Sequence, residues 1–343
     1  MSKISVIILN WNGNKLLREY LPSVVQYSNP DIADIIVADN GSTDESLDTL
    51  RREFPTVQIN TLGKNYGFAK GYNLAIQNIS TPYCILLNDD VRVTEHWLEP
   101  MLEYMESNPQ VGALQPKLLS DRDPKSFEYA GAAGGYLDKF GYPYCRGRIF
   151  DTIEEDKGQY DKVRKIMWAT GACLMVRTEL YRQAVGLDND FFAHMEEIDL
   201  CWRIRNLGYD IVCIPQSKVY HYGGASLSMG NPHKTKLNFR NSLLMLYKNL
   251  PVQCRRRIII TRLLLDGVAA ANFLVHGQWQ HVKAIWKAHR EANQMVRDIY
   301  RNKHKVHGMR IKSQPSVSQF KEEKISILWN YYILRRKTYT SLF

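Results

Sequence analysis

Two adjacent carboxylates, Asp89 and Asp90, follow an apolar run over residues 83–87, with Asn88 between the run and the pair. An apolar run of this length predicts a buried strand, and the carboxylates would then lie where that strand leaves its sheet. A hard divalent cation, Mg²⁺ or Mn²⁺, prefers oxygen ligands, and a nucleotide diphosphate can complete its coordination shell. The alternative is that both carboxylates simply begin a solvated loop.

A second acidic group, Glu196, Glu197 and Asp199, stands at the start of a helix that we expect over residues 197–207. Gly208 fits the position directly after that helix. One of the two adjacent glutamates could face a crevice and act as a general base. The alternative is structural, because carboxylates stabilise the positive end of a helix dipole.

Three further positions could bind a metal ion or parts of a nucleotide. His221 precedes two glycines and could be a metal ligand, although a single histidine is more often structural. Asp39 could accept the N3–H of uracil or thymine, or it could form a turn with the residues that follow it. Gly67, at a predicted helix start, could leave backbone N–H groups free for an anion, or it could form a tight turn.

The elements that would position these residues alternate along the first hundred positions. We expect strands at residues 4–9, 35–38, 57–59 and 83–87, and helices that end near residues 25, 52, 78 and 107. Asn12 or Asn14 could cap the first helix, and Ser42 with Glu45 has the spacing of a capping box. This alternation predicts a parallel sheet with helices on both faces, and polar residues at three strand ends that converge on one crevice.

The second half of the chain has a different character. Residues 120–165 are rich in glycine, tyrosine and charge, and we expect loops with a short hairpin that lie near the binding place of a second, acceptor substrate. Regular structure should resume over residues 167–176 and continue with a strand at 211–214. From residue 238 onward the pattern is helical and basic.

The order and spacing of the polar segments resemble family 2 glycosyltransferases with the GT-A fold, especially the rhamnosyltransferase-like members. The similarity runs from residue 4 to about residue 226 and includes Asn-Trp-Asn-Gly, Asp-Asn-Gly-Ser-Thr-Asp, Asn-Tyr-Gly-Phe-Ala, Leu-Leu-Asn-Asp-Asp, Thr-Gly-Ala-Cys-Leu-Met-Val-Arg, Glu-Glu-Ile-Asp-Leu-Cys and Tyr-His-Tyr-Gly-Gly-Ala-Ser.

The resemblance implies an α/β fold with a GT-A-type nucleotide-binding sheet, mainly parallel and mixed at one edge, flanked by helices. Residues 1–237 would form the catalytic domain, with a nucleotide-sugar-binding half at 1–119 and an acceptor-binding half at 120–237. Residues 238–343 would form a basic helical extension.

The resemblance also implies roles for individual residues. Asp90 matches the last, metal-binding Asp of the family's DxD motif, and Asn88 replaces the first one. His221 matches a histidine that joins the metal in some relatives. Glu197 matches the catalytic base, where Asp is more usual, and Glu196 or Asp199 stay open as alternatives. The nucleotide sugar would be bound by Asn10, Asn12, Asp39, Asn65, Gly67, Asn88 and Asp89.

The expected reaction is an inverting, single-displacement sugar transfer with Mg²⁺ or Mn²⁺. The base would remove a proton from the acceptor hydroxyl while that oxygen attacks the anomeric carbon. The donor would be a dTDP- or UDP-sugar, with dTDP-rhamnose preferred. The acceptor would be a glycan or a polyprenyl-diphosphate-linked glycan in cell-surface polysaccharide synthesis.

The basic residues are concentrated near the C-terminus. Residues 251–343 carry 18 Lys+Arg and 5 Asp+Glu, a net charge of +13 against +10 for the whole chain. With apolar and aromatic neighbours, they suit an anionic membrane surface, or a helical subdomain packed on the core. We expect no membrane-spanning helix, because Arg262 and Asp266 interrupt the best candidate, and no signal peptide. The enzyme would be cytoplasmic, on the inner face of the cytoplasmic membrane.

Three other functions remain open at this point. A nucleic-acid-binding protein would also be basic, but no nucleic-acid motif accompanies the tail, so we expect no nucleic-acid partner. A nucleotidyltransferase or phosphohydrolase could use the same acidic crevice. A non-catalytic nucleotide-sugar-binding protein could retain it. The six cysteines lack a CxxC pair, which argues against a zinc site or a disulfide framework.

Overall fold

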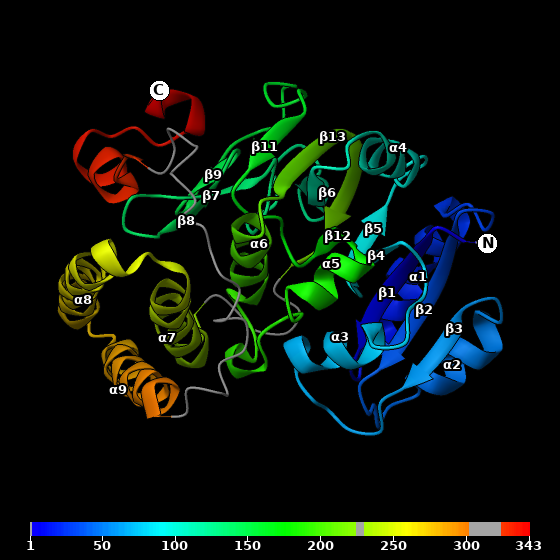
Figure 1. Cartoon of the computed structure of the whole chain (residues 1–343), viewed down its shortest axis with the longest axis horizontal. Coiled ribbons are helices and arrows are strands. Elements are labelled where there is room, and N and C mark those ends of the chain that lie inside the picture. Colours follow the sequence, from blue (N-terminus) through cyan, green and yellow to red (C-terminus); the bar gives the residue numbers. More distant parts are fainter. Residues whose placement is uncertain (1, 224–229, 302–323) are drawn as a thin grey trace.

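The computed structural model describes residues 2–223, 230–301 and 324–343. The main sheet contains β1 (Ile4–Asn10), β2 (Ala33–Asp39), β3 (Gln58–Thr61), β4 (Tyr83–Asn88), β5 (Val91–Val93), β6 (Val111–Ser120), β11 (Arg164–Ile166), β12 (Cys173–Arg177) and β13 (Asp210–His221). The strands run in the order β11-β13-β6-β12-β4-β1-β2-β3, and β5 pairs with β13 (Figure 1).

Helices cover both faces of this sheet, and further helices continue beyond it. They are α1 (Asn14–Tyr27), α2 (Ser46–Glu53), α3 (Phe68–Ile76), α4 (Glu99–Ser107), α5 (Thr178–Gln183), α6 (Glu196–Asn206), α7 (Pro232–Asn249), α8 (Val252–Val275) and α9 (Trp279–Arg301). The predicted α/β class is therefore confirmed.

The first half of the sheet is parallel, with β1 between β2 and β4 and with β3 beside β2. Alternate residues of β1 point to opposite faces: Val6 and Ile8 pack in one core cluster with α1, and Ile7 packs in the other with Tyr72 of α3. Burial on both faces explains why these strands are continuously apolar.

Antiparallel pairing begins at β12, which lies between β4 and β6 and opposes both strands. Antiparallel pairing is therefore found in the centre of the sheet as well as at its edge, where we expected it. β13 runs parallel to β6 and antiparallel to β5. In the β13–β5 register His221 lies opposite Val91, the residue after Asp90, so the sheet itself brings His221 to the acidic pair.

Residues 120–165 contain more sheet than we expected. A second sheet has the order β10-β9-β8-β7, and its strands are β7 (Gly135–Leu137), β8 (Pro143–Cys145), β9 (Arg148–Ile149) and β10 (Thr152–Ile153). Gly135 allows a close approach to Trp168, because a Cβ at Gly135 would lie 2.0 Å from the indole ring. Contacts of this kind between residues distant in sequence stabilise short strands where we expected a loop.

Both predicted helix caps are wrong. The N-cap position of α1 is Gly13 and carries no side-chain cap, and α2 begins at Ser46 rather than after Ser42. Asn12 Oδ1 instead accepts a hydrogen bond from the backbone N–H of Thr43 (2.7 Å), and Ser42 Oγ accepts one from that of Asn12 (2.9 Å). These side chains join the ends of β1 and β2.

The basic C-terminal region begins within the core. α7 runs across the division that we predicted between residues 237 and 238, and its Leu244 and Met245 are buried in the same core cluster as Ile7. The chain end also returns to this cluster, since Tyr339 stacks on Tyr136 with ring centroids 5.7 Å apart. The division at residue 237 stays a prediction.

By length and composition, one helix of the described residues could span a membrane, although we expected none. α8 is long and apolar enough to cross a membrane, because Arg262 and Asp266 are too few charges to exclude it. Both charged residues are buried against the rest of the protein. The core helix of a soluble protein can have the same composition. The exposure of the apolar side chains of α8 therefore decides between a core helix and a helix in contact with a membrane.

Candidate active site

The end of β13 and the segment after β4 form a buried ion pair. His221 Nε2 lies 3.0 Å from Asp90 Oδ1, and the two residues are 8% and 4% exposed. Asp90 Oδ2 accepts a hydrogen bond from the backbone N–H of Gly223 (3.1 Å), and Asn88 Nδ2 lies 3.3 Å from His221 Nε2. The predicted partners Asn88, Asp90 and His221 are thus brought together, while residues 224–226 of the last matching segment lie outside the described residues.

Glu128 is a member of this cluster that sequence reasoning missed. Its Oε1 lies 3.2 Å from His221 Nδ1, and it is buried. Burial lowers the pKa of His221, but its hydrogen bonds to Asp90 and Glu128 outweigh burial and raise it to about 10. Burial also raises the pKa of Asp90, but the bond to His221 prevails and lowers it. Glu128 is a single carboxylate in a glycine-rich stretch, and no motif marked it.

The donor set of this cluster fits a divalent cation. Two neighbouring ligands of an octahedral ion lie about 3 Å apart when each is about 2.1 Å from the metal, which matches the separation of Asp90 Oδ1 and His221 Nε2. Burial and the charge of Asp90 raise the pKa of Asp89 to about 7. Within the described residues no three His, Cys, Asp or Glu side chains form a complete ligand group, so other oxygen atoms would have to complete the shell.

Asn10 and Asp39 form the neighbouring wall, at the ends of β1 and β2. Asn10 Nδ2 donates to Asp39 Oδ1 (3.2 Å), and Asp39 Oδ2 accepts from the backbone N–H groups of Gly41 (3.2 Å) and Ser42 (3.1 Å). Asn10 Oδ1 is buried without a hydrogen-bond partner among the described residues. A Cβ at Gly13 would lie 2.5 Å from that oxygen and 2.7 Å from Asp89 Oδ2, so Gly13 leaves space where β1 and β4 end.

Asn65 and Gly67 hold the loop before α3. The backbone N–H of Gly67 donates to Asn65 Oδ1 (2.8 Å), so this N–H is not free for an anion, and the turn is the alternative that the structure has. Asn40 Nδ2 donates to the same Asn65 oxygen (3.2 Å) and to Gly67 O (3.2 Å). Gly67 has φ of 77°, and a Cβ there would lie 3.0 Å from the ring of Phe192. Gly67 therefore lets the loop before α6 approach α3.

The segment that leads into α6 has an unusual backbone. Phe192, His194 and Met195 have φ angles of 65°, 70° and 72°, which L-residues adopt at a cost of about 1–3 kcal/mol each. The buried Asn241 of α7 donates from Nδ2 to three carbonyl oxygens of this segment, those of Phe191, Ala193 and His194. α7 thereby holds the segment in its strained conformation.

Glu196 and Glu197 follow this segment as the first residues of α6, and each has a buried Oε2 without a hydrogen-bond partner among the described residues. Burial raises the pKa of Glu197 to about 7, and burial together with the charge of Glu197 raises that of Glu196 well above its usual value. A Cβ at Gly171 would lie 3.7 Å from the Cβ of Glu197, and the next residue, Ala172, accepts a hydrogen bond from the backbone N–H of Asn88 (3.0 Å). Glu197 therefore lies near the strand end that carries Asp90.

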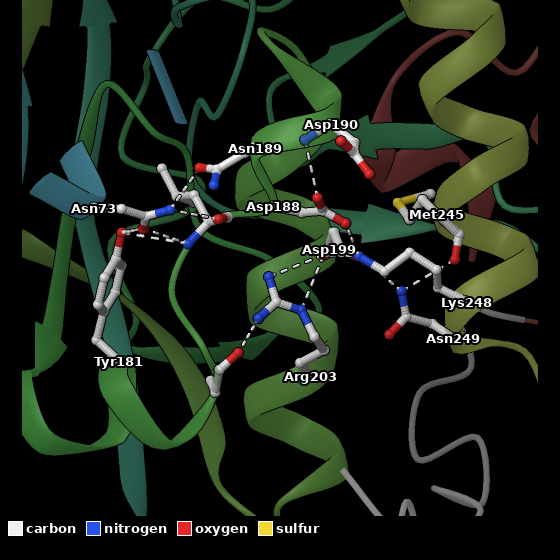
Figure 2. A network of polar contacts seen from close by, with 12 residues as sticks. Asn73, Tyr181, Asp188, Asn189, Asp190, Asp199, Arg203, Met245, Lys248 and Asn249 are labelled. Carbon is white, nitrogen blue, oxygen red and sulfur yellow. Dashed lines mark hydrogen bonds and ion pairs between the residues drawn. The ribbon is translucent and has the colours of Figure 1, made fainter. Parts of the chain in front are cut away.

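Asp199 belongs to a different, closed network (Figure 2). Its carboxylate accepts hydrogen bonds from Arg203 Nε (2.9 Å), Lys248 Nζ (2.9 Å) and Asn249 Nδ2 (2.7 Å). Burial raises its pKa, but Lys248 and Arg203 prevail and lower it. An ionised carboxylate with occupied oxygens is a weak general base, so Asp199 joins α6 to α7, while Glu196 and Glu197 keep free oxygen atoms.

Two rhamnosyltransferases are similar to this chain in sequence. The N-acetylglucosaminyl-diphospho-decaprenol L-rhamnosyltransferase of Mycobacterium tuberculosis (strain ATCC 25618 / H37Rv) is 25% identical over 237 residues, which cover 64% of this chain and 76% of that protein. The dTDP-rhamnosyl transferase RfbF of Shigella flexneri is 22% identical over 229 residues, 63% of this chain and 71% of that protein.

Solved glycosyltransferases of the GT-A type have the same fold. S. aureus TarS 1-349 in complex with UDP-GlcNAc superimposes with a TM-score of 0.56 at 14% identity, over 83% of this chain and 80% of TarS. The mannosyltransferase PcManGT from Pyrobaculum calidifontis, in complex with GDP-Man and Mn²⁺, gives 0.51 at 14% identity, over 88% of this chain and 81% of PcManGT. The model of glycosyl transferase family 2 matches residues 5–183, more than half of the chain, and this protein therefore belongs to glycosyl transferase family 2.

Proposed function

We propose that this glycosyltransferase transfers a sugar with inversion from a nucleotide diphosphate to a lipid-linked glycan, with a divalent cation bound by Asp90 and His221. The observation that carries the proposal is the arrangement of two chemically distinct groups near one strand end. The first is the ion pair of Asp90 with His221. The second is the carboxyl group of Glu197, which has a raised pKa and an Oε2 atom without a hydrogen-bond partner among the described residues.

Each group has a definite task in this mechanism. The bound cation, Mg²⁺ or Mn²⁺, would supply Lewis-acid stabilisation of the departing diphosphate. Asp90 and His221 would hold it, and Asp89 would add negative charge once deprotonated. His221 would bind the cation only as the neutral imidazole, so it would first have to give up the proton that its raised pKa indicates. Glu197 takes the proton of the acceptor hydroxyl while that oxygen attacks the anomeric carbon from the opposite face. A pKa near 7 suits this task, since the carboxylate is ionised at neutral pH and is still basic enough to accept the proton.

The relatives narrow the substrates. Two of them are named as rhamnosyltransferases, one for a dTDP-rhamnosyl donor and one for a diphospho-decaprenol acceptor. We therefore propose dTDP-rhamnose as donor, with Asp39 near its pyrimidine, and a polyprenyl-diphosphate-linked acceptor. Such a lipid places the reaction at the inner face of the cytoplasmic membrane. A role in cell-envelope polysaccharide synthesis follows, in line with an O-antigen biosynthesis relative from Myxococcus xanthus.

The proposal is tested by Glu197→Gln, which keeps the shape of the side chain and removes its basicity. We expect the turnover rate to fall about a hundredfold or more, while the affinity for dTDP-rhamnose with Mn²⁺ changes little. Glu155→Gln, a surface glutamate change, is the matched control. Full activity of the Glu197→Gln protein would contradict the assignment. Release of pyrophosphate from a nucleoside triphosphate mixed with a sugar 1-phosphate would instead show a nucleotidyltransferase. Donor binding without turnover in the unaltered protein would show a binding module.

A further inference from the structure

The polarity of α8 is opposite to that of a helix on the surface of a soluble domain. The two charged residues in the middle of the helix face the protein: Arg262 and Asp266 are 3% and 1% exposed, whereas the exposed Arg256 and Arg257 stand near its N-terminal end. Its apolar residues face outward, and Leu264 and Val268 are 70% and 67% exposed. A helix with apolar side chains outside and polar side chains against the protein is typical of contact with lipid.

The buried polar residues of α8 make specific contacts. Arg262 donates to the carbonyl oxygens of Phe140 (3.2 Å) and Gly141 (3.1 Å) and to Ser242 Oγ of α7 (2.8 Å). Asp266 Oδ2 lies 2.9 Å from His289 Nε2 of α9. These contacts fix the rotation of α8 about its axis. Because one side of the helix is held against α7 and α9, α8 would lie along a bilayer surface rather than cross it.

A groove lies between α7 and α9. Its volume is about 690 Å³, and the residues that line it include His233, Lys236, Lys283, Trp286, Lys287 and Arg290. Glu291 is the one carboxylate among its lining residues, and it pairs with Lys236 at 3.1 Å. The basic excess suits an anion with more than one charge, and the exposed ring of Trp286 suits the level of lipid headgroups.

The first turn of α7 connects the groove with the surroundings of Glu128. His233, which lines it, is followed by Lys234. Burial lowers the pKa of Lys234, and the nearby carboxylate of Glu128 opposes this shift. Glu128 in turn contacts His221.

Contacts also connect the groove to the segment before α6. Glu291, which lines the groove, pairs with Arg240 of α7 (3.5 Å), and Arg240 Nη2 donates to the carbonyl oxygen of Phe191 (3.0 Å). A ligand held in the groove could therefore extend along α7 toward the segment that leads to Glu197.

We propose that the exposed face of α8 lies in one leaflet of an anionic bilayer, and that the groove between α7 and α9 binds the diphosphate of the acceptor lipid at headgroup level. The groove assignment rests on the lipid-linked acceptor of the proposed function, whereas the membrane contact of α8 rests on the helix alone. A second copy of the chain could also cover α8. The net charge of +13 over residues 251–343 disfavours that symmetric contact and favours an anionic surface.

Sedimentation of the full chain with vesicles of phosphatidylcholine and phosphatidylglycerol tests the contact of α8. Val268→Glu places a charge on the exposed face, and we expect it to weaken vesicle binding about tenfold or more. Val163→Glu, at an exposed position outside the tail, should bind as the unaltered chain does. Equal binding by the Val268→Glu protein would overturn the proposal. So would a dimer in solution that Val268→Glu dissociates.

The groove is tested with phosphatidylcholine vesicles that carry a small fraction of a polyprenyl diphosphate. The double change Lys283→Gln with Lys287→Gln should reduce the affinity added by the diphosphate lipid about tenfold or more, since each lysine near a membrane surface contributes about 1 kcal/mol. The double change Lys157→Gln with Lys162→Gln, at exposed positions outside the tail, should have no effect.

Two outcomes would overturn the groove assignment. The first is an equal loss on phosphatidylglycerol vesicles that contain no diphosphate lipid, which would show a general surface charge effect. The second is equally tight binding of inorganic pyrophosphate without lipid, which would show a site for a soluble anion. Sugar transfer to a short water-soluble acceptor separates the two proposals. The Val268→Glu protein should retain this transfer activity. If the unaltered chain transfers no sugar to such an acceptor, the proposed function fails, while the vesicle result still decides the role of α8.

Discussion

The partly buried side chain of Glu197, with its buried Oε2, predicts a link between catalysis and stability. Its pKa of about 7 in the folded protein lies above the ordinary value of 4.5, because burial disfavours the charged form. The folded state therefore binds more protons than the unfolded state between these values, and the free energy of unfolding falls as pH rises from about 4.5 to 7. Glu197→Gln, which resembles the neutral acid, should remove this loss.

Thermal unfolding at pH 5 and pH 8 measures the effect. We expect Glu197→Gln to stabilise the protein by about 1–3 kcal/mol at pH 8 and by much less at pH 5. The exposed change Glu155→Gln should show no such dependence. A stabilisation by Glu197→Gln that is equal at both pH values would mean that Glu197 is not held as a neutral acid in the fold.

The sequence located most of the residues of this site but not all of their contacts. Asp90 and His221 were predicted from separate segments, and the pairing of β5 with β13 brings them together. Glu128 could not be predicted, because its partner His221 is distant in sequence and no local pattern marks it. Asn12 and Ser42 were misassigned as caps, since local spacing cannot distinguish a cap from a contact between two strand ends.

Among the elements, α7 is the support of the proposed base. Asn241 holds three carbonyl oxygens of the strained segment before Glu196, and this segment sets the start of α6. Asn241→Leu keeps a similar volume but removes the donors. We expect it to destabilise the protein by about 2–4 kcal/mol, because buried acceptors lose their partners. We also expect the turnover rate to fall about tenfold to a hundredfold, because the base is displaced.

Steady-state kinetics separates this positioning role from simple loss of fold. With folded protein the KM for the donor should change less than about threefold while the turnover rate falls, because the donor-binding strand ends are held by other contacts. Asn238→Leu, one turn earlier on the same helix, is the matched control. A rise in the KM for the donor as large as the fall in the turnover rate would contradict a role for Asn241 in placing Glu197, and so would an unchanged turnover rate.

At the level of secondary structure, the strands β1, β2, β3 and β4 were predicted, and β12 and β13 overlap segments that we expected to be regular. Strand β6 was not predicted, and the second sheet was expected only as loops with a short hairpin. Strands β1, β2 and β4 are continuous apolar runs whose type follows from burial on both faces. The short strands between residues 135 and 153 are too brief, and too rich in glycine and tyrosine, to show a period. Their pairing depends on contacts such as that of Gly135 with Trp168, which no local pattern encodes.

For the whole molecule, the basic C-terminal extension, the tail predicted over residues 238–343, does more than offer a surface to a membrane. Its two ends pack on the catalytic half, α7 against the segment before α6 and Tyr339 against the second sheet, while α8 and α9 extend outward (Figure 1). Composition indicated a basic helical tail but could not indicate that the chain end returns to the core. A membrane test that removes the tail would therefore also remove part of the fold, whereas point changes on α8 leave these contacts in place.

The returning chain end yields the last prediction. Tyr339 is buried, stacks on Tyr136, meets Tyr160 edge-on with ring centroids 5.8 Å apart, and donates from its backbone N–H to Glu154 Oε1 (2.9 Å). Tyr339→Ala should therefore lower the free energy of unfolding in urea by about 3–5 kcal/mol, the usual cost of removing a buried aromatic ring. Tyr332→Ala, at a half-exposed tyrosine of the same segment, should cost less than about 1 kcal/mol. Equal, small effects of the two changes would show that the chain end does not stabilise the catalytic half.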